Sequence, residues 1–407
     1  MNLYKKILYI LLLIYITIYP ILPTYGLINS DIILYCLALV YLTGLLIYKK
    51  ERQNLFYIIK NIFNDNILLS ITSLNLLMYL SVFIAIDKRV TFTNSIRFSM
   101  YIFVFYLISY KIKSLKQVST IIKCFIFTSF LSGIYSLIQI GYIFYLGYTI
   151  DPSVRISSFL ENPNNLSAYS ILSIFIVISL LINSRNKKSK VLYTSLLALL
   201  LVNIIFSQSR SALLAIVFGF LIFSVLWNKR FLIFSIFIPI ILFIIPQSRV
   251  RLMQIFDASQ NSSRLNIWEI TKLIINDNPI FGIGYENFSV NYLNYIKNNP
   301  SYSIRDGYIA LHPHNVFLKI QVELGILGSV IFIIFLTSII YTLYKLIKFK
   351  SNSKLKVLII GISTSFTTFM LMNLIDCYLD APKIMITFII LLGILTYYKN
   401  HSNINLN

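Results

Sequence analysis

Charged residues are scarce in this sequence. They make up 12% of its 407 residues, whereas hydrophobic residues make up 57%; an ordinary soluble domain has roughly 25% charged residues. So little charge could not cover the surface of a soluble protein of this length. The composition therefore excludes a soluble fold and indicates a membrane protein.

Cysteine and acidic residues are also few. The three cysteines, Cys36, Cys124 and Cys377, form no pairing pattern, so the sequence predicts no disulfide framework. Asp and Glu number 14 against 35 Lys and Arg, which gives a formal net charge of +21. Most of the basic residues fall in segments that would face the cytoplasm if the N-terminus lies inside, so the charge records membrane orientation. We therefore expect no nucleic-acid partner.

Long apolar runs recur from end to end and predict about twelve transmembrane helices, because roughly 20 apolar residues cross a bilayer as a helix. The first run lacks the small-residue cleavage site of a signal peptide and is expected to be retained. The predicted fold is an all-α polytopic membrane protein with one large outer, periplasmic loop. The runs are 7–22, 31–48, 67–86, 91–110, 118–146, 165–183, 191–206, 212–227, 231–245, 326–344, 357–375 and 383–398.

These runs divide the chain into four parts. Residues 1–245 hold spans one to nine, and residues 246–312 form the large outer loop with short helices. Residues 313–398 hold an interfacial helix and the last three spans, and residues 399–407 form a cytoplasmic tail. We expect the chemistry on the outer side, where the one large aqueous segment lies.

Two outer segments place an arginine beside residues that end or begin a helix. Arg155 begins "RISSFLENPNNLSAY", in which Asn165 or Ser167 is expected to cap the helix that enters the membrane. Arg210 lies in "SQSRSALLA", on a connection short enough to stay at headgroup depth. Each arginine also has an ordinary interpretation, as a snorkelling side chain for Arg155 or an anchor to lipid phosphate for Arg210.

The third segment is "SSRLNIWEITKLIINDNPIFGIGYENF", residues 262–288, in the large loop. A helix is expected from Ser262 or Ser263 to about Asn276. Arg264, Trp268 and Lys272 are four residues apart, so they share one basic and aromatic face of it. The "GIG" that follows is weak evidence for phosphate binding, since no strand precedes it and most such pairs are tight turns.

The segment "LHPHNVFLKIQVELGILGSV", residues 311–330, holds two of the three histidines. A zinc site needs three or four ligands, and no other histidine accompanies His312 and His314, so we expect no metal. A structural role and acid–base chemistry remain, and His314 is the better candidate for a base because Pro313 fixes the backbone before it and Asn315 follows at a helix start. Lys319 and Glu323 are spaced to pair on a short amphipathic helix that precedes a span beginning at Ile326.

Taken together, these segments resemble the O-antigen ligase and polymerase superfamily of bacterial surface-polysaccharide enzymes. The matching pieces are "FLENPNNLSAY", "SQSRSALL", "SRLNIWEITKLIINDNPIFGIGYENF" and "HPHNVFLKIQVELGILG", in that order. The resemblance implies a membrane glycosyltransferase of GT-C-like architecture in the bacterial cytoplasmic (inner) membrane, with its active site on the outer face. Its substrate would be a glycan carried by undecaprenyl diphosphate.

The resemblance also implies roles for individual residues. The family's essential arginines match Arg210 and Arg264, its essential histidine matches His314, and a recurrent arginine matches Arg155. We expect His314, Arg210 and Arg264 to be catalytic. The expected substrate-binding residues are Arg155, Arg210, Arg264, Trp268, Lys272 and Asn315. No cofactor is expected, because the diphosphate linkage stores the driving force for an inverting transfer.

Three functions follow from this interpretation. A polymerase, which joins lipid-linked repeat units, is favoured; a ligase, which transfers the glycan to lipid A core, needs the same residues. A transporter or flippase is the further alternative, but such proteins favour spans broken by Gly or Pro at mid-membrane, and here only Pro239 lies within a span. Membrane lipid, a chain-length regulator and a flippase of the same pathway are the other expected partners.

Overall fold

The computed structural model is described here for residues 1–407 except 27–28, 256, 306, 350–352 and 402–407. In these residues the chain forms helices and connecting loops, and no strand. The predicted all-α membrane fold is confirmed. Apolar helices dominate because a backbone in hydrocarbon must satisfy its hydrogen bonds within its own segment.

The helices follow the predicted apolar runs closely. In the first half they are α1 (Asn2–Ile18), α2 (Ser30–Ile47), α3 (Lys49–Lys60), α4 (Asn66–Leu80), α5 (Lys88–Tyr106), α6 (Leu115–Tyr145), α7 (Pro163–Asn183) and α8 (Lys187–Phe206). In the second half they are α9 (Arg210–Leu226), α10 (Leu232–Ile244), α11 (Pro246–Met253), α12 (Ala258–Asp277), α13 (Phe288–Asn298), α14 (Val316–Phe349), α15 (Ser353–Met372) and α16 (Pro382–Asn400). Short single turns join some of these, among them η3 (Leu107–Lys111) and η6 (Tyr378–Asp380).

The predicted count of twelve spans is not confirmed. Within the described residues, eight helices are long and apolar enough to cross a membrane, and a ninth span results if α10 and α11, which meet at a bend of 101°, count as one. The other predicted runs also form helices, but α1 and α9 have 17 residues each, about 25 Å of helix. Helix α5 carries Lys88, Arg89 and Arg97.

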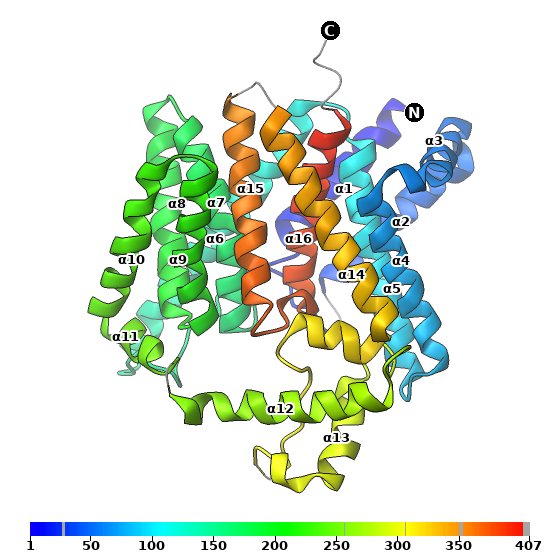
Figure 1. Ribbon diagram of the computed structural model, residues 1–407. Helices are drawn as coiled ribbons and strands as arrows, with labels where there is room; N and C mark the ends of the chain where they lie inside the picture. Colours follow the sequence, from blue (N-terminus) through cyan, green and yellow to red (C-terminus); the bar gives the residue numbers. More distant parts are fainter. Residues whose placement is uncertain (27–28, 256, 306, 350–352, 402–407) are drawn as a thin grey trace.

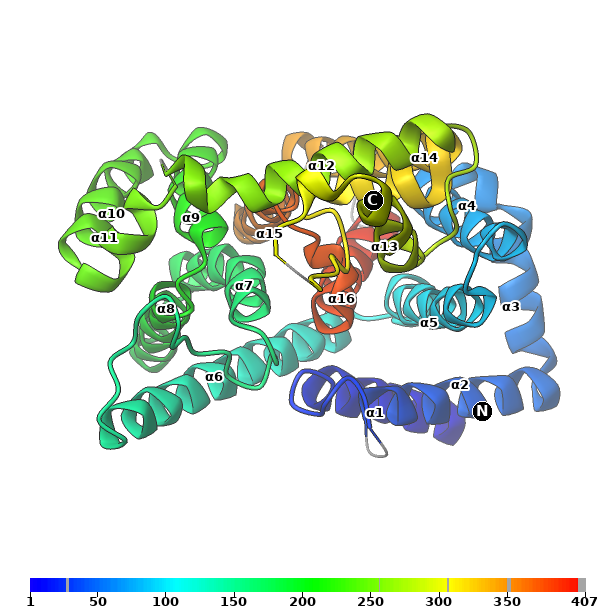
Figure 2. The ribbon, with the colours of Figure 1, turned by 90° about the horizontal axis from the view of Figure 1, so that it is seen from below.

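The long helices form a bundle, and the segment predicted as the outer loop covers one end of it (Figure 1). Helix α12 lies across that end, with α13 below it, whereas the start of α1 and helix α3 lie at the opposite end. Viewed from below, α16 stands near the centre of the bundle (Figure 2). Every residue of α16 from Lys383 to Tyr398 is buried, so α16 forms the core against which the other helices pack.

Two helix starts differ from the sequence prediction. Helix α12 begins at Ala258, before the expected Ser262 or Ser263. Helix α7 is capped by Asn162, whose side chain accepts a hydrogen bond from the Asn164 backbone N–H, with Pro163 in the first turn. The Asn-Pro pair is therefore the cap, since proline suits the first helical position, where no backbone donor is needed.

Helix α14 contains a break at the point where the predicted interfacial helix would meet the next span; its interfacial position stays a prediction. At Gly325 the backbone takes φ 65° and ψ −164°, so the chain turns before the apolar segment that begins at Ile326. The Ile326 N–H donates to the Pro279 carbonyl oxygen at 3.0 Å, and the N–H groups of Ile283 and Gly284 donate to carbonyls just before the break. The turn after α12 is thus fastened to the turn inside α14.

Replacing Gly325 with alanine is expected to destabilise the protein strongly. Its backbone conformation is essentially restricted to glycine, at a cost of about 1–3 kcal/mol for other residues. In addition, a Cβ there would lie 2.0 Å from the Ile280 carbonyl oxygen, whereas a Cβ on Gly141 in α6 meets nothing within 4 Å. Thermal unfolding in detergent should show a melting temperature several degrees lower for Gly325→Ala than for the control Gly141→Ala. Equal melting temperatures would contradict this account of the turn.

Candidate active site

The residue predicted to be a general base, His314, forms a hydrogen bond with a buried carboxylate. Its Nδ1 lies 2.9 Å from Oδ1 of Asp376, which comes from the connection between α15 and α16. Burial acts to raise the pKa of Asp376, but His314, His312 and Arg264 outweigh it and lower this pKa to about 2. The carboxylate is therefore ionised at neutral pH. It can hold a proton on Nδ1 of His314 and leave Nε2 facing the site as the acceptor.

The His-Pro-His turn is held rigidly from two sides. His314 has φ 51°, a left-handed conformation that is uncommon outside glycine. Its backbone N–H donates to Nδ1 of His312 at 3.3 Å, and Nε1 of Trp268 on α12 donates to the Pro313 carbonyl at 2.8 Å. Burial lowers the pKa of His312 to about 4, so His312 is neutral and its ring can accept that bond. The strained turn fixes where the His314 ring points.

Arg155 is connected to Asp376 through the turn before α7. Its guanidinium donates to the Ser207 carbonyl oxygen at 2.6 Å and to Oδ1 of Asn164 at 2.6 Å. The amide of Asn164 in turn donates to Oδ2 of Asp376 at 3.4 Å. The arginine ahead of the Asn-Pro-Asn turn therefore lies in the same polar network as the histidine.

Further arginines gather beside this network. Nη1 of Arg210, the first residue of α9, donates to the Gln254 carbonyl at 3.0 Å. Arg251 on α11 donates to the Gln208 carbonyl and to Oε1 of Gln254, each at 2.8 Å. Arg264 at the start of α12 lies near enough to act electrostatically on Arg210, Arg251 and Asp376. Burial and the charges of neighbouring arginines lower the pKa of Arg210 and of Arg251, so an anion bound here would stabilise their charged forms.

Two cavities meet at the histidines. One of about 220 Å³ is lined by His312, His314, Asp376 and the Asn-Pro-Asn turn. Another of about 360 Å³ lies between α5, the 285–289 segment and the start of α16, and it shares His312 and Asp380 with the first. The histidine turn thus lies between two cavities.

A buried cluster of charged residues lies near His312 of the turn. Lys319 and Glu323, which are predicted to pair from their spacing, lie 3.7 Å apart. The pair is buried, and two further carboxylates contact Lys319. Nζ of Lys319 lies 2.7 Å from Oε1 of Glu286 and also contacts Asp380. Burial raises the pKa of Glu286 well above its ordinary value, and the nearby Asp380 and Glu323 raise it further. A proton on Glu286 therefore offsets part of the excess negative charge around one ammonium group.

The fold supplies a third potential metal ligand that the sequence did not indicate. Ligand atoms of His312, His314 and Asp376 lie within 4.8 Å of one another, so the shortage of ligands expected from the sequence does not hold. The charge around them is unsuited to a cation, however, because Arg155 and Arg264 both act electrostatically on Asp376. Catalysis without a metal ion stays a prediction.

The remaining predicted substrate-binding residues have structural contacts. The Trp268 indole N–H is committed to Pro313, as described. The Asn315 side chain caps α14 by accepting from the N–H groups of Phe317 and Leu318, and it donates to the Leu374 carbonyl. Lys272 pairs with Glu269 at 2.7 Å, and its side chain is 58% exposed. Trp268 and Asn315 thus position the histidine turn, and their contact with substrate stays a prediction.

Three residues of the site were missed in the sequence analysis. Asp376 was available as one of two acids, with Asp380, in a short outer connection, "NLIDCYLDAPK", between two apolar runs. Asn164 lies in the quoted segment "RISSFLENPNNLSAY", but no role was predicted for it. Arg251 follows the apolar run 231–245 among other basic residues, and no local pattern distinguishes it from them.

Comparison with known proteins agrees with the resemblance drawn from the sequence. A family model described as O-antigen ligase matches residues 194–333. The match includes Arg210, Arg251, Arg264 and both histidines of the turn, and leaves out Asp376. No curated protein matches the chain. Residues 194–333 thus match an O-antigen ligase domain within a multi-pass helical membrane protein, and this match supports the resemblance to the O-antigen ligase and polymerase superfamily.

Proposed function

We propose that this protein transfers a glycan from a polyprenyl diphosphate carrier to a hydroxyl group of an acceptor. One observation carries the proposal: the carboxylate that orients His314, Asp376, also lies within electrostatic range of Arg155 and Arg264 at the end of the bundle. A base and a set of fixed cations are what a displacement at a sugar–phosphate bond requires. The matched family model supports this type of function.

His314 serves as the general base in this mechanism. Nε2 takes the proton of the acceptor hydroxyl as its oxygen attacks C1 of the donor sugar. Asp376, bonded to Nδ1, stabilises the imidazolium that results. His312 and Trp268 hold the turn so that the ring does not have to be ordered during the reaction.

The arginines bind the leaving group. As the bond from acceptor oxygen to C1 forms, the bond from C1 to the phosphate oxygen breaks, and the diphosphate leaves with the electron pair. We assign Arg210 and Arg264 to neutralise the negative charge that develops on the diphosphate. A guanidinium group can donate two parallel hydrogen bonds to two phosphate oxygens. A single displacement inverts the anomeric centre, and the proton ends on His314.

The membrane explains where these groups lie. The diphosphate of a polyprenyl carrier sits at headgroup depth with its tail in the bilayer, and Arg210 begins α9 at the end of the bundle covered by α12. Basic residues gather at the end of the bundle opposite to α12. By the positive-inside rule, the end covered by α12 therefore faces outward. We accordingly place the active site on the outer face of the cytoplasmic membrane.

We assign the acceptor as a second lipid-linked repeat unit, which makes the protein a polymerase; transfer to lipid A core would make it a ligase. The test is the glycolipid profile of a deletion strain. Core lipid that carries single repeat units is the result expected for a polymerase. Bare core with accumulated lipid-linked polymer would instead indicate the ligase, and an unchanged profile would contradict glycan transfer altogether.

Activity is expected to survive metal chelation, because the arginines supply the positive charge that a divalent cation would otherwise bring. Purified protein in nanodiscs should transfer glycan equally well before and after treatment with EDTA. The grouping of His312, His314 and Asp376 makes this a sharp test. Loss of transfer in EDTA and its recovery with added zinc, magnesium or manganese would show that these residues hold a metal.

A further inference from the structure

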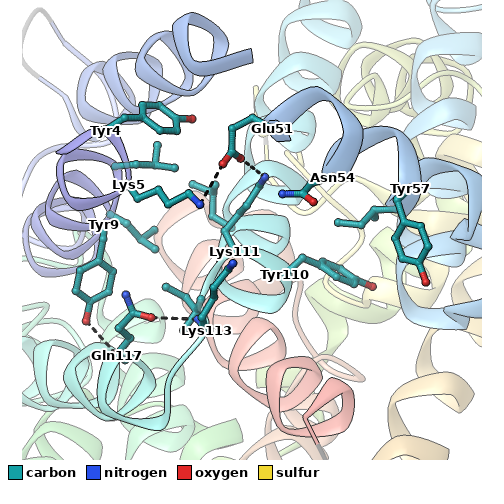
Figure 3. A pocket seen from close by; sticks show the side chains of 15 residues that line it. Tyr4, Lys5, Tyr9, Glu51, Asn54, Tyr57, Tyr110, Lys111, Lys113 and Gln117 are labelled. Atoms are coloured by element: carbon teal, nitrogen blue, oxygen red, sulfur yellow. Dashed lines mark hydrogen bonds and ion pairs between the residues drawn. The ribbon is translucent and has the colours of Figure 1, made fainter. Parts of the chain in front are cut away.

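A second polar cavity lies at the end of the bundle opposite to α12, where α1 begins and α3 lies (Figure 1), and Figure 3 shows its lining residues. Its volume is about 370 Å³, and its walls come from α1, α3, η3 and the start of α6. Three lysines, Lys5, Lys111 and Lys113, line it together with Glu51. None of these residues takes part in the proposed glycan transfer, so the cavity needs its own explanation.

The charge of this cavity is positive. Glu51, whose side chain is 2% exposed, lies 2.5 Å from Nζ of Lys111 and 3.6 Å from Nζ of Lys5. Figure 3 shows both lysines pointing toward it. Burial acts to raise the pKa of Glu51, but Lys111 and Lys5 outweigh burial and lower it. The cavity thus has one carboxylate, which contacts two of its three lysines, and the excess positive charge is suited to an anion.

The backbone around Lys111 is built in an unusual way. Helix α5 ends in a π turn, η3, over residues Leu107–Lys111. Such turns are rare and are frequent at functional sites, because they widen the helix and re-aim the side chains on it. Here the turn brings Lys111 to the cavity wall, where its ammonium group also lies 5.4 Å from the ring centre of Tyr41. The arrangement indicates a ligand-binding site.

The surroundings place the cavity at the surface of the bilayer. Helix α3 begins with basic residues and exposes the large apolar side chains Phe56 and Ile59, at 69% and 56%. A helix with basic residues and exposed aromatic and aliphatic side chains lies along the membrane interface. The cavity is also lined by apolar side chains, among them Leu8, Leu12 and Ile112. A ligand there meets cations on one side and hydrocarbon on the other.

We propose that this cavity binds the phosphate headgroup of an anionic glycerophospholipid, with Lys5, Lys111 and Lys113 around the phosphate and Glu51 holding two of them in place. The lipid would join α1, α3 and α6 at the face of the bilayer opposite the histidine turn. Free phosphate shares the anionic chemistry but lacks the acyl chains, which would contact the exposed apolar side chains of α3. The proposal is independent of glycan transfer.

The test measures thermal stability and lipid binding of the purified full-length protein in detergent. Phosphatidylglycerol should raise the melting temperature, whereas zwitterionic phosphatidylcholine and inorganic phosphate should not. Each surface-accessible lysine contributes about 1 kcal/mol to anionic-lipid binding, so its loss should weaken the affinity about fivefold. Lys5→Gln/Lys113→Gln should therefore bind phosphatidylglycerol about 25-fold more weakly, which native mass spectrometry would detect.

Lys116→Gln is the matched control. Lys116 is exposed, lies three residues after Lys113 in the first turn of α6 and does not line the cavity. Equal weakening in this variant and in Lys5→Gln/Lys113→Gln would overturn the proposal, as would equal binding of phosphatidylcholine by the wild type. Stabilisation by inorganic phosphate alone would refute the lipid as the source of the phosphate. If the double variant fails to fold, the wild-type comparison of the two lipids decides.

Discussion

His314→Ala is expected to slow single-turnover glycan transfer by about 10²- to 10⁴-fold, the loss typical of a general base, while donor binding stays near the wild-type value. The reason is that the ring acts on the acceptor hydroxyl and not on the diphosphate. Asp376→Asn should produce a loss of similar order. An amide keeps the shape of the carboxylate but cannot stabilise the imidazolium, and it no longer fixes the proton on Nδ1.

Two histidines serve as comparisons in the same assay in nanodiscs. His312→Ala should be much milder, because His312 is neutral and supports the His314 backbone through one hydrogen bond of 3.3 Å. His401→Ala should have no effect, since His401 contacts Tyr397 at the end of α16, away from the site. Near wild-type transfer by His314→Ala, or an inactive His312→Ala beside it, would show that the base has been assigned wrongly.

Arg210→Lys is expected to reduce transfer severely, by about 10²-fold or more, although it keeps the charge. Lysine offers a point charge where a guanidinium can present two parallel donors to phosphate oxygens, and removing one fixed donor to a developing oxyanion typically costs about 10²- to 10³-fold. Arg264→Ala should lose transfer as well, with weaker donor binding, because Arg264 reaches the site from α12. Single-turnover transfer and donor affinity in nanodiscs measure both effects.

Arg185→Lys provides the matched control for Arg210→Lys. Arg185 is an exposed arginine in the connection between α7 and α8, at the opposite end of the bundle. Its substitution should leave expression, donor binding and transfer unchanged. If Arg210→Lys transfers glycan as well as Arg185→Lys does, then the paired donors are not required, and Arg210 is only an anchor to lipid phosphate.

Much of this protein could be predicted from the sequence because the membrane imposes local rules. An apolar run of sufficient length has to form a helix, and each of the twelve predicted runs overlaps one. The break before Ile326 was equally visible, since a glycine separates an amphipathic stretch from an apolar one. Asn315 caps its helix as its position suggested. Periodicity and capping act over a few residues, so a single segment contains all the information needed.

The tertiary structure alone decided which residues meet. Asp376 is 62 residues from His314 in sequence, and Asn164 is 212 residues from Asp376, yet they form one network with Arg155. Nothing near Arg251 in the sequence shows that it donates to Gln208, 43 residues before it. Helix packing, which depends on the shapes of all the side chains in the bundle, brings these loops to one end. The histidine is readable in the sequence, but the carboxylate that orients it is not, because the chain order of the helices does not determine which connections become neighbours.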